Sequence, residues 1–154
     1  MKKAYIAAPF TEKSVNTKKT HTYGKIEDIS YRNFLDAIES VLKEFGFETF
    51  LPHRDIHKWG SVYIEPNLVT KQSLDALKQS DILVTCPEKS AGANIELGWA
   101  SALGKNIVIF IHEKEHPSLM QVGLEGITNA KIIRFKDIMD LRQKLRGYMS
   151  ALNS

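Results

Sequence analysis

The chain has 154 residues, of which 43% are apolar and 25% charged, and its formal net charge is +3. This length and composition suit a single globular domain that spans residues 1–154 and contains one sizeable core. The charge is mild, and no expected helix carries a sustained stripe of Lys and Arg, which argues against a nucleic-acid polymer as partner.

The cysteine content and the N-terminal segment bear on the cellular compartment. Cys86 is the only cysteine, so the chain forms no internal disulfide, and we interpret it as a buried or edge thiol. Met1-Lys2-Lys3 leads directly into an apolar strand rather than into the core of a signal peptide. The longest apolar runs are far too short to cross a bilayer. We therefore expect a cytoplasmic protein without a membrane partner.

Along the chain, apolar runs alternate with segments of helical periodicity. The short runs, bounded by Pro or polar residues, predict five strands, and apolar residues at helical spacing predict the helices between them. Ser30 is the expected cap of the first helix and Gly46 its end. The expected strands are residues 4–8, 47–51, 81–86, 106–111 and 131–135, and the expected helices are residues 30–46, 66–79, 93–103, 117–126 and 137–149.

Two connections show no clear period. Residues 9–28 form a polar loop that is long enough for a lid or a binding role, with a disordered surface insertion as the alternative. The lysines of this loop, Lys13 among them, favour a solvated surface over phosphate binding. Residues 53–60 are polar and aromatic and predict a second loop after the second strand.

The alternation of strands and helices predicts an α/β fold with one parallel sheet covered by helices on both faces. For five strands the commonest arrangement is the doubly wound order 2-1-3-4-5, as in flavodoxin-like and Rossmann-like domains. Ligands then bind at the switch point between strands one and three, outside their carboxyl ends. This geometry brings residues 9–14 beside residues 90–96.

Several common signatures are absent from the sequence. No GxGxxG motif follows the first strand, no Walker A loop is present, and no GxSxG elbow occurs, so dinucleotide binding and serine-triad hydrolysis are unsupported. The pairs His53/His57 and His112/His116 have four-residue spacing but fall in expected loops. We therefore expect neither a metal site nor a cofactor.

Three features converge at the expected switch point: the turn at Ser90 and Gly92, Glu96, and Tyr5. Ser90 and Gly92 offer a hydroxyl and backbone amides just before a helix, where an anion binds well, although Ser90 could simply cap the turn. Glu96 follows, and the helix dipole is expected to favour its ionised form. It is either a nucleophile at a sugar's anomeric carbon or a charge that complements the dipole. Tyr5 either reaches this crevice or is a core aromatic.

At these residues the chain resembles the nucleoside 2-deoxyribosyltransferase family, including its branch of 2'-deoxynucleoside 5'-phosphate N-hydrolases. The resemblance covers nearly the whole chain. It is carried by residues 5–10 and 47–55, and above all by Ser90-Ala91-Gly92, followed after three residues by Glu96-Leu97-Gly98.

The resemblance implies a role for each matching residue. Glu96 matches the nucleophile that holds a covalent glycosyl intermediate, and Tyr5 matches the tyrosine that hydrogen-bonds this glutamate. The loop from Ala8 to about Ser14 matches the stretch that wraps the sugar and phosphate, and His53 matches a base-side residue. The implied substrate-binding residues in these two stretches are Ala8, Pro9, Phe10, Thr11 and His53.

Ser90 bears on the choice of substrate. In the transferases an aspartate at this position binds the sugar 5'-hydroxyl, whereas in the nucleotide hydrolases a serine binds the 5'-phosphate. A hydroxyl with adjacent amides can donate to a phosphate that an aspartate would repel. Ser90 and Gly92 therefore imply nucleoside 5'-monophosphates as substrates. Ser118 to Met120 resembles the segment that reaches into the neighbouring subunit's site, which implies a homodimer or higher homo-oligomer.

One position departs from the family's pattern. The family carries an aspartate in the helix before the third strand, whereas this chain has Ser73 there and Asp75 two residues later. Two residues rotate a helix by roughly 200°, so Asp75 is expected to face away. Three hypotheses follow: an N-glycosidase acting on (deoxy)nucleoside 5'-monophosphates, a deoxyribosyltransferase that exchanges bases between deoxynucleosides, and a non-catalytic nucleotide-binding or sensing module.

Overall fold

Five parallel strands pair in one sheet of order β2-β1-β3-β4-β5, which confirms the predicted topology. The computed structural model describes residues 1–10, 13 and 26–154. The prediction of a lid in the first loop, and Thr11 with it, lies outside these residues. The strands are β1 (Lys2–Ala7), β2 (Phe47–Phe50), β3 (Ile82–Thr85), β4 (Asn106–His112) and β5 (Ala130–Phe135).

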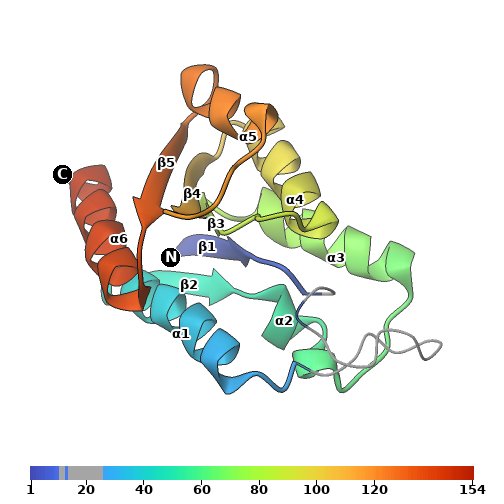
Figure 1. The fold of residues 1–154 in the computed structure, drawn as a ribbon. Coiled ribbons are helices and arrows are strands. Elements are labelled where there is room, and N and C mark those ends of the chain that lie inside the picture. The colour runs from blue at the N-terminus through green and yellow to red at the C-terminus, as the bar shows by residue number, and fades with distance from the viewer. Residues whose placement is uncertain (11–12, 14–25) are drawn as a thin grey trace.

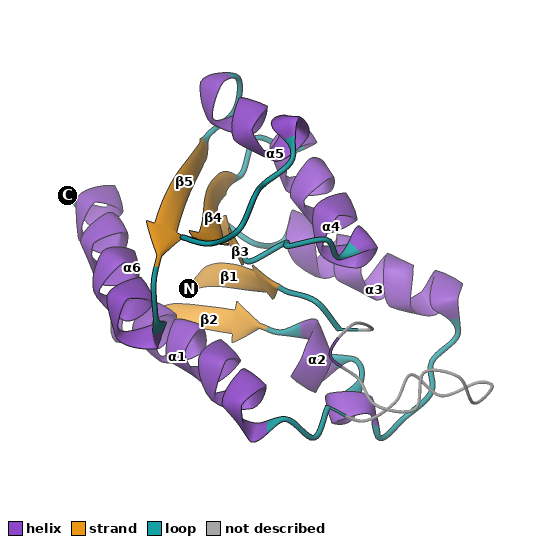
Figure 2. Ribbon diagram, viewed as in Figure 1, coloured by secondary structure: helices purple, strands orange, loops and turns teal. Residues whose placement is uncertain are grey.

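Helices cover both faces of this sheet (Figures 1 and 2). The longer ones are α1 (Ile29–Glu44), α3 (Pro66–Lys78), α4 (Ala91–Ala102) and α6 (Ile138–Asn153). Shorter turns are α2 (Pro52–Asp55), η2 (Lys58–Gly60), α5 (Leu119–Gly123) and η3 (Leu124–Gly126). In the part of the chain that the structure describes, every helix is too short or too polar to traverse a membrane.

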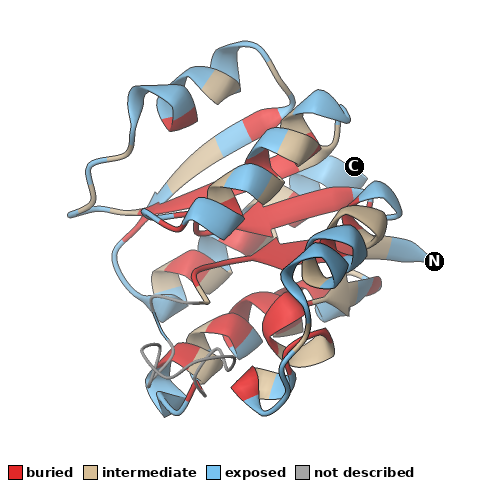
Figure 3. Cartoon of the chain, turned by 90° about the vertical axis from the view of Figure 1, so that its right-hand side faces the viewer, coloured by how far each residue is buried: buried red, intermediate tan, exposed pale blue. Residues whose placement is uncertain are grey.

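The alternation of side chains along the strands builds two cores. Side chains that point to one face of the sheet, such as Ile6, Val84 and Val108, pack with α1 and α6. Side chains that point to the other face, such as Tyr5 and Leu83, pack with α3 and α4. The buried strands between partly exposed helices are visible in Figure 3. Burial on both faces explains why β3 and β4 read as continuous apolar runs.

Three local expectations differ from the structure. Helix α1 begins at Ile29 because the Asp28 side chain accepts from the Tyr31 amide at 3.2 Å, so Asp28 rather than Ser30 is its cap. Helix α4 begins at Ala91, two residues earlier than expected. In place of the expected loop at 53–60 the chain forms two short helices: α2, whose first residue is Pro52, and η2. A helix of four residues is too short to show a period in the sequence.

Candidate active site

Two adjoining cavities open at the carboxyl edge of the sheet, where the chain leaves the neighbouring strands β1 and β3. The inner pocket has a volume of about 380 Å³, and the outer cleft has a volume of about 680 Å³. Ser90 lines both. The inner pocket is lined by Ala7, Ala8, Phe10, Pro52, His53, His57, Val69, Ser73, Ser90, Ala91, Gly92, Ala93 and Glu96. The outer cleft is lined by Pro9, Lys13, Glu88, Lys89, Ser90, Asn94, Glu115, His116, Ser118 and Gln121.

Glu96 is the one carboxylate on the described wall of the inner pocket. It lies in the second turn of α4, and its Oε2 is enclosed and has no hydrogen-bond partner among the described residues. Burial raises the pKa of Glu96 to about 7, although the contact with Tyr5 by itself lowers this pKa. The expectation that the helix dipole favours the ionised form is therefore wrong. The dipole acts within the first turn, whereas Glu96 lies beyond it in an enclosed site.

Tyr5 and Ser73 complete the surroundings of this carboxylate. Tyr5 is fully buried on β1, and burial together with the nearby Glu96 charge raises its pKa, so its hydroxyl keeps its proton. The Ser73 hydroxyl, by contrast, lowers the pKa of Tyr5. Among the described residues the Tyr5 hydroxyl has no hydrogen-bond partner of regular geometry, but Glu96 and Ser73 both shift its pKa. Tyr5 is therefore a core aromatic that lines neither cavity, with its hydroxyl beside the Glu96 carboxylate.

Asp75 faces away from the pocket, as the helix geometry predicted. Its side chain is 45% exposed and pairs with Lys71 at 2.5 Å one turn earlier on α3. Ser73, which is buried, occupies the pocket-facing position instead. The site therefore has Ser73 where the family pattern has an aspartate.

The Ser90 turn combines a helix cap with a potential anion site. The Ser90 Oγ accepts from the Ala93 amide at 3.2 Å, which leaves its O–H free to donate elsewhere. The amides of Ala91 and Gly92 lie in the first turn of a 12-residue helix, where they lack intrahelical partners. A Cβ added at Gly92 would lie 4.0 Å from the Ser90 Oγ, so the missing side chain leaves space beside this hydroxyl. Ser90 is thus a helix cap whose hydroxyl can still donate a hydrogen bond, and it lies where the two cavities meet.

Aromatic and imidazole rings form the opposite side of the inner pocket. The His53 Nε2 lies 2.9 Å from the Pro9 carbonyl, which makes Nε2 the protonated nitrogen of a neutral ring. Burial lowers the pKa of His53 to about 4, so the ring is neutral at pH 7. Phe10 stacks on His57 with ring centroids 4.1 Å apart and planes inclined by 20°. Such a wall suits a flat heterocycle.

The sequence did not single out His57 or Gln121 as site residues. His57 follows His53 by four residues, a spacing that in a sequence points to metal binding rather than to a ring wall. In the described part of the chain, no group of three or more His, Cys, Asp and Glu side chains is arranged to hold a metal ion. Gln121 gave no signal, because it reaches the cleft through contacts with residues far away in the sequence.

The remaining predicted residues lie outside the inner pocket. Pro9 and Ser118 line the outer cleft, on the same chain as Ser90. Ser118 caps α5 and its Oγ accepts from the Gln121 amide at 3.2 Å. Met120 lines neither cavity; it is 82% exposed on the outside of α5. Ser118 therefore reaches its own chain's cleft without a partner, whereas Met120 faces solvent.

These features define a class of protein: a doubly wound α/β domain with an enclosed carboxylate beside a tyrosine hydroxyl, next to a helix start able to bind an anion. The sequence profile of the nucleoside 2-deoxyribosyltransferase family matches residues 27–143. The chain belongs to this family, whose members are enzymes that act on nucleosides or nucleotides. A search of curated proteins finds no match.

Solved structures show the same fold over nearly the whole chain. The CMP N-glycosidase BcmB of Clostridium botulinum is 26% identical, with a TM-score of 0.71 over 96% of this chain and 99% of that one. BlsM is 24% identical, with a TM-score of 0.75 over 99% and 94%. A 2-deoxyribosyltransferase from Bacillus psychrosaccharolyticus is 22% identical, with a TM-score of 0.59 over 93% and 95%.

Proposed function

We propose that the protein is an N-glycosidase that hydrolyses the bond between base and sugar in nucleoside 5'-monophosphates. The observation that carries this proposal is the Glu96 carboxylate, which lines the inner pocket beside Tyr5 in the second turn of the helix that Ser90 caps. In this proposal the inner pocket binds the sugar and the base, and the phosphate lies beside Ser90, which lines both cavities.

In this proposal Glu96 is the nucleophile. Its ionised carboxylate attacks C1' of the sugar and forms an ester, while the C–N bond breaks and the base leaves with the bonding electron pair and acquires a proton. Water then attacks C1', returns the carboxylate and loses its proton, so that sugar phosphate and free base are the products. Tyr5, which keeps its proton, orients the carboxylate and stabilises its charged form.

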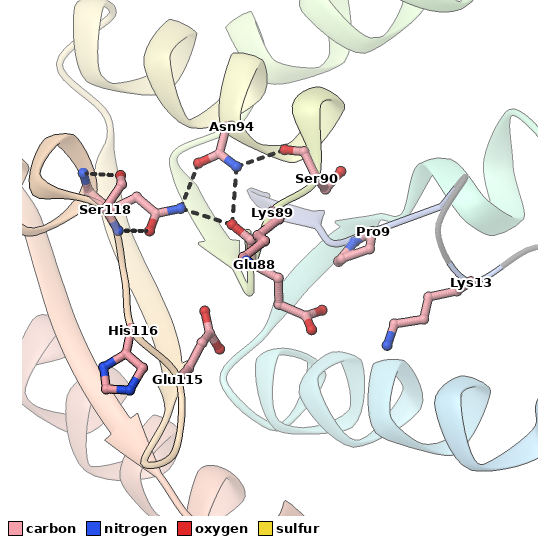
Figure 4. A pocket seen from close by; sticks show the side chains of 10 residues that line it. Pro9, Lys13, Glu88, Lys89, Ser90, Asn94, Glu115, His116 and Ser118 are labelled. Atoms are coloured by element: carbon pink, nitrogen blue, oxygen red, sulfur yellow. Dashed lines mark hydrogen bonds between the residues drawn. The ribbon is translucent and has the colours of Figure 1, made fainter.

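The 5'-phosphate is proposed to bind at the start of α4. The Ser90 hydroxyl and the amides of Ala91 and Gly92 supply donors there, and the helix dipole favours negative charge. Lys13 and Lys89 also line the outer cleft. Glu88 and Glu115 line it too, and Figure 4 shows both carboxylates in the cleft below the Ser90 turn, that of Glu88 directed toward Lys13.

The comparisons favour a nucleotide over a free nucleoside. BcmB, which shares 26% of its residues with this chain, acts on CMP, and it is matched over 99% of its length. Ser90 supports the same choice, because a serine donates to a phosphate where an aspartate would repel it. The wall of Phe10, His53 and His57 is the proposed site of the base.

A second candidate is base exchange between deoxynucleosides, favoured by the match to the nucleoside 2-deoxyribosyltransferase profile. The two reactions share the glycosyl intermediate and differ in whether water or a second base intercepts it. They are therefore distinguished by products rather than by residues.

We also propose a homodimer whose contact includes α5. Leu119, Met120 and Ile127 are 90%, 82% and 83% exposed, which is unusual for large apolar side chains that lie close together in the chain. Light scattering tests this assembly. A monomer at micromolar concentration with full activity would refute it, and Met120→Glu is expected to weaken the dimer while the charge-matched surface variant Gln143→Glu leaves it intact.

The function is tested by measuring free base released from a panel of nucleoside 5'-monophosphates and nucleosides, with and without an added acceptor base. We expect release from monophosphates without acceptor, abolished in Glu96→Ala and retained in Glu48→Ala, a matched variant at an exposed position on β2. Products that form only with an acceptor base would establish exchange instead. Tight binding without turnover, unchanged in Glu96→Ala, would refute both reactions.

A further inference from the structure

Gln121 connects two segments of the outer cleft that lie far apart in sequence. It is 6% exposed on α5, although glutamine is ordinarily a surface residue. Its Oε1 accepts from the Ser118 backbone amide at 3.0 Å, and its Nε2 donates to the Asn94 Oδ1 at 2.8 Å and to the Glu88 carbonyl at 3.1 Å. The side chain therefore bonds to the α5 cap and to the start of α4 at the same time.

The two amides form a chain of hydrogen bonds with a fixed direction. Asn94 donates through Nδ2 to the Ser90 carbonyl at 2.7 Å, so its Oδ1 is left to accept from Gln121. The Ser118 amide is only a donor and the Ser90 carbonyl only an acceptor, so neither side-chain amide can be reversed without losing a bond. Figure 4 shows this path running from Ser118 through Asn94 to Ser90.

These hydrogen bonds hold the turn of residues 88–90, which contains an unfavourable backbone conformation. Glu88 has a φ of +47°, in the left-handed region that residues other than glycine seldom adopt. Its carbonyl accepts from both Gln121, at 3.1 Å, and Asn94, at 3.3 Å. These two bonds hold the turn from Glu88 to Ser90 in one place, and with it the Ser90 hydroxyl.

We propose that Gln121 is a positioning residue for the phosphate subsite and that it sets the preference for 5'-phosphorylated substrates over free nucleosides. This inference rests on the proposed function, in which Ser90 binds the phosphate. The Gln121 side chain bonds to Ser118, Glu88 and Asn94, which line the outer cleft, and Gln121 does not line the inner pocket. Its loss is therefore expected to weaken the binding of the phosphate and to spare the chemistry at Glu96.

The variant Gln121→Glu isolates this role. A glutamate has nearly the same shape and can still accept from the Ser118 amide, but it cannot donate to Glu88 or Asn94 and places a charge beside their oxygens. Asn94 can turn its amine toward the new carboxylate only by giving up its bond to Ser90. Gln121→Met, which removes the same donors without adding a charge, is the second variant. Gln143→Glu on the exposed side of α6 is the matched control.

The experiment measures binding and turnover separately. Binding of a nucleoside 5'-monophosphate, the matching nucleoside and inorganic phosphate is measured by calorimetry in a Glu96→Gln background, which prevents turnover. Gln121→Glu is expected to weaken the binding of monophosphate and of inorganic phosphate about tenfold, the size of one or two lost hydrogen bonds, and to leave nucleoside binding unchanged. With Glu96 intact, the loss should appear in KM and not in kcat.

Two outcomes overturn the inference. One is equal binding of monophosphate before and after both substitutions at Gln121, and the other is an equal loss for monophosphate and nucleoside. Thermal unfolding shows which variants fold. If Gln121→Glu does not fold, the binding measurements on Gln121→Met decide the question. Failure of the proposed function is a separate result, because it appears as absence of base release in the unsubstituted protein.

Discussion

The raised pKa of Glu96 makes the pH dependence of the reaction a direct test of its role. A nucleophilic carboxylate acts in its ionised form, and burial raises the Glu96 pKa to about 7. The kcat/KM is therefore expected to rise from acid pH and level off above about pH 7. At pH 5, two units below the pKa, about 1% of Glu96 is ionised, so kcat/KM should be about a hundredfold below its plateau.

Tyr5→Phe moves this pH dependence in a direction that the structure fixes. The Tyr5 hydroxyl lowers the pKa of Glu96, since it stabilises the charged form, so its removal makes Glu96 harder to ionise. A well-formed hydrogen bond to a charged group contributes about 1.5–3 kcal/mol, and one pKa unit corresponds to about 1.4 kcal/mol. The contact here lacks regular geometry, so we take the lower end and expect the midpoint to rise by about one unit.

The assay is kcat/KM for base release between pH 5 and 9. The substrate phosphate itself titrates near pH 6, as phosphate monoesters do, so the test depends on the displacement between variants rather than on one midpoint. Tyr148→Phe, in a partly buried tyrosine of α6, is the matched control and should leave the midpoint in place. An unchanged midpoint in Tyr5→Phe, or a shift toward acid, would refute the pairing of Tyr5 with Glu96.

Three further substitutions test the burial of Glu96, its distance from Ser73, and the proposed phosphate site at Ser90. Because the folded pKa of Glu96 is raised, its stabilising contribution is full below the unfolded value of 4.5 and is lost as the pH rises through about 7. Urea unfolding should therefore show Glu96→Gln more stable than the unsubstituted protein by up to about 3 kcal/mol at pH 8 and equal at pH 4; no gain at pH 8 would contradict the burial argument. Ser73→Asp places a second carboxylate beside Tyr5 and Glu96, so the midpoint of the kcat/KM profile should move to higher pH, and an unmoved midpoint would exclude proximity of the two acids. Ser90→Asp should raise KM for monophosphates at least about tenfold through charge repulsion and leave KM for nucleosides within about twofold, whereas equal effects would argue against a phosphate at Ser90.

The sheet was predictable because its signals are local and repeated. The centres of the runs, such as residues 82–84, are apolar, as strands buried on both faces require, and their alternation with helices leaves few topologies. Helix starts were less accessible. Asp28 and Ser30 are both good caps by residue type, and only the position of the Tyr31 amide decides between them.

The electrostatics of the site could not be read from the sequence. The place of Glu96 after a helix start suggested an ionised carboxylate, but its burial comes from β1, α3 and α4 together, and that arrangement raises its pKa. Asp75 shows the opposite case, because two residues along a helix fix the direction of a side chain. Gln121 depends on Asn94, 27 residues away, and no pattern in the sequence relates the two.

In the proposed reaction Glu96 is a nucleophile that becomes covalently bonded to the sugar. Mass spectrometry of protein mixed with a nucleoside 5'-monophosphate and quenched in acid within one turnover measures this directly. We expect a fraction of the chain to carry the mass of the sugar phosphate on the peptide that contains Glu96, with no adduct in Glu96→Gln. Base release at the full rate by Glu96→Gln, or an adduct on another residue, would contradict the account.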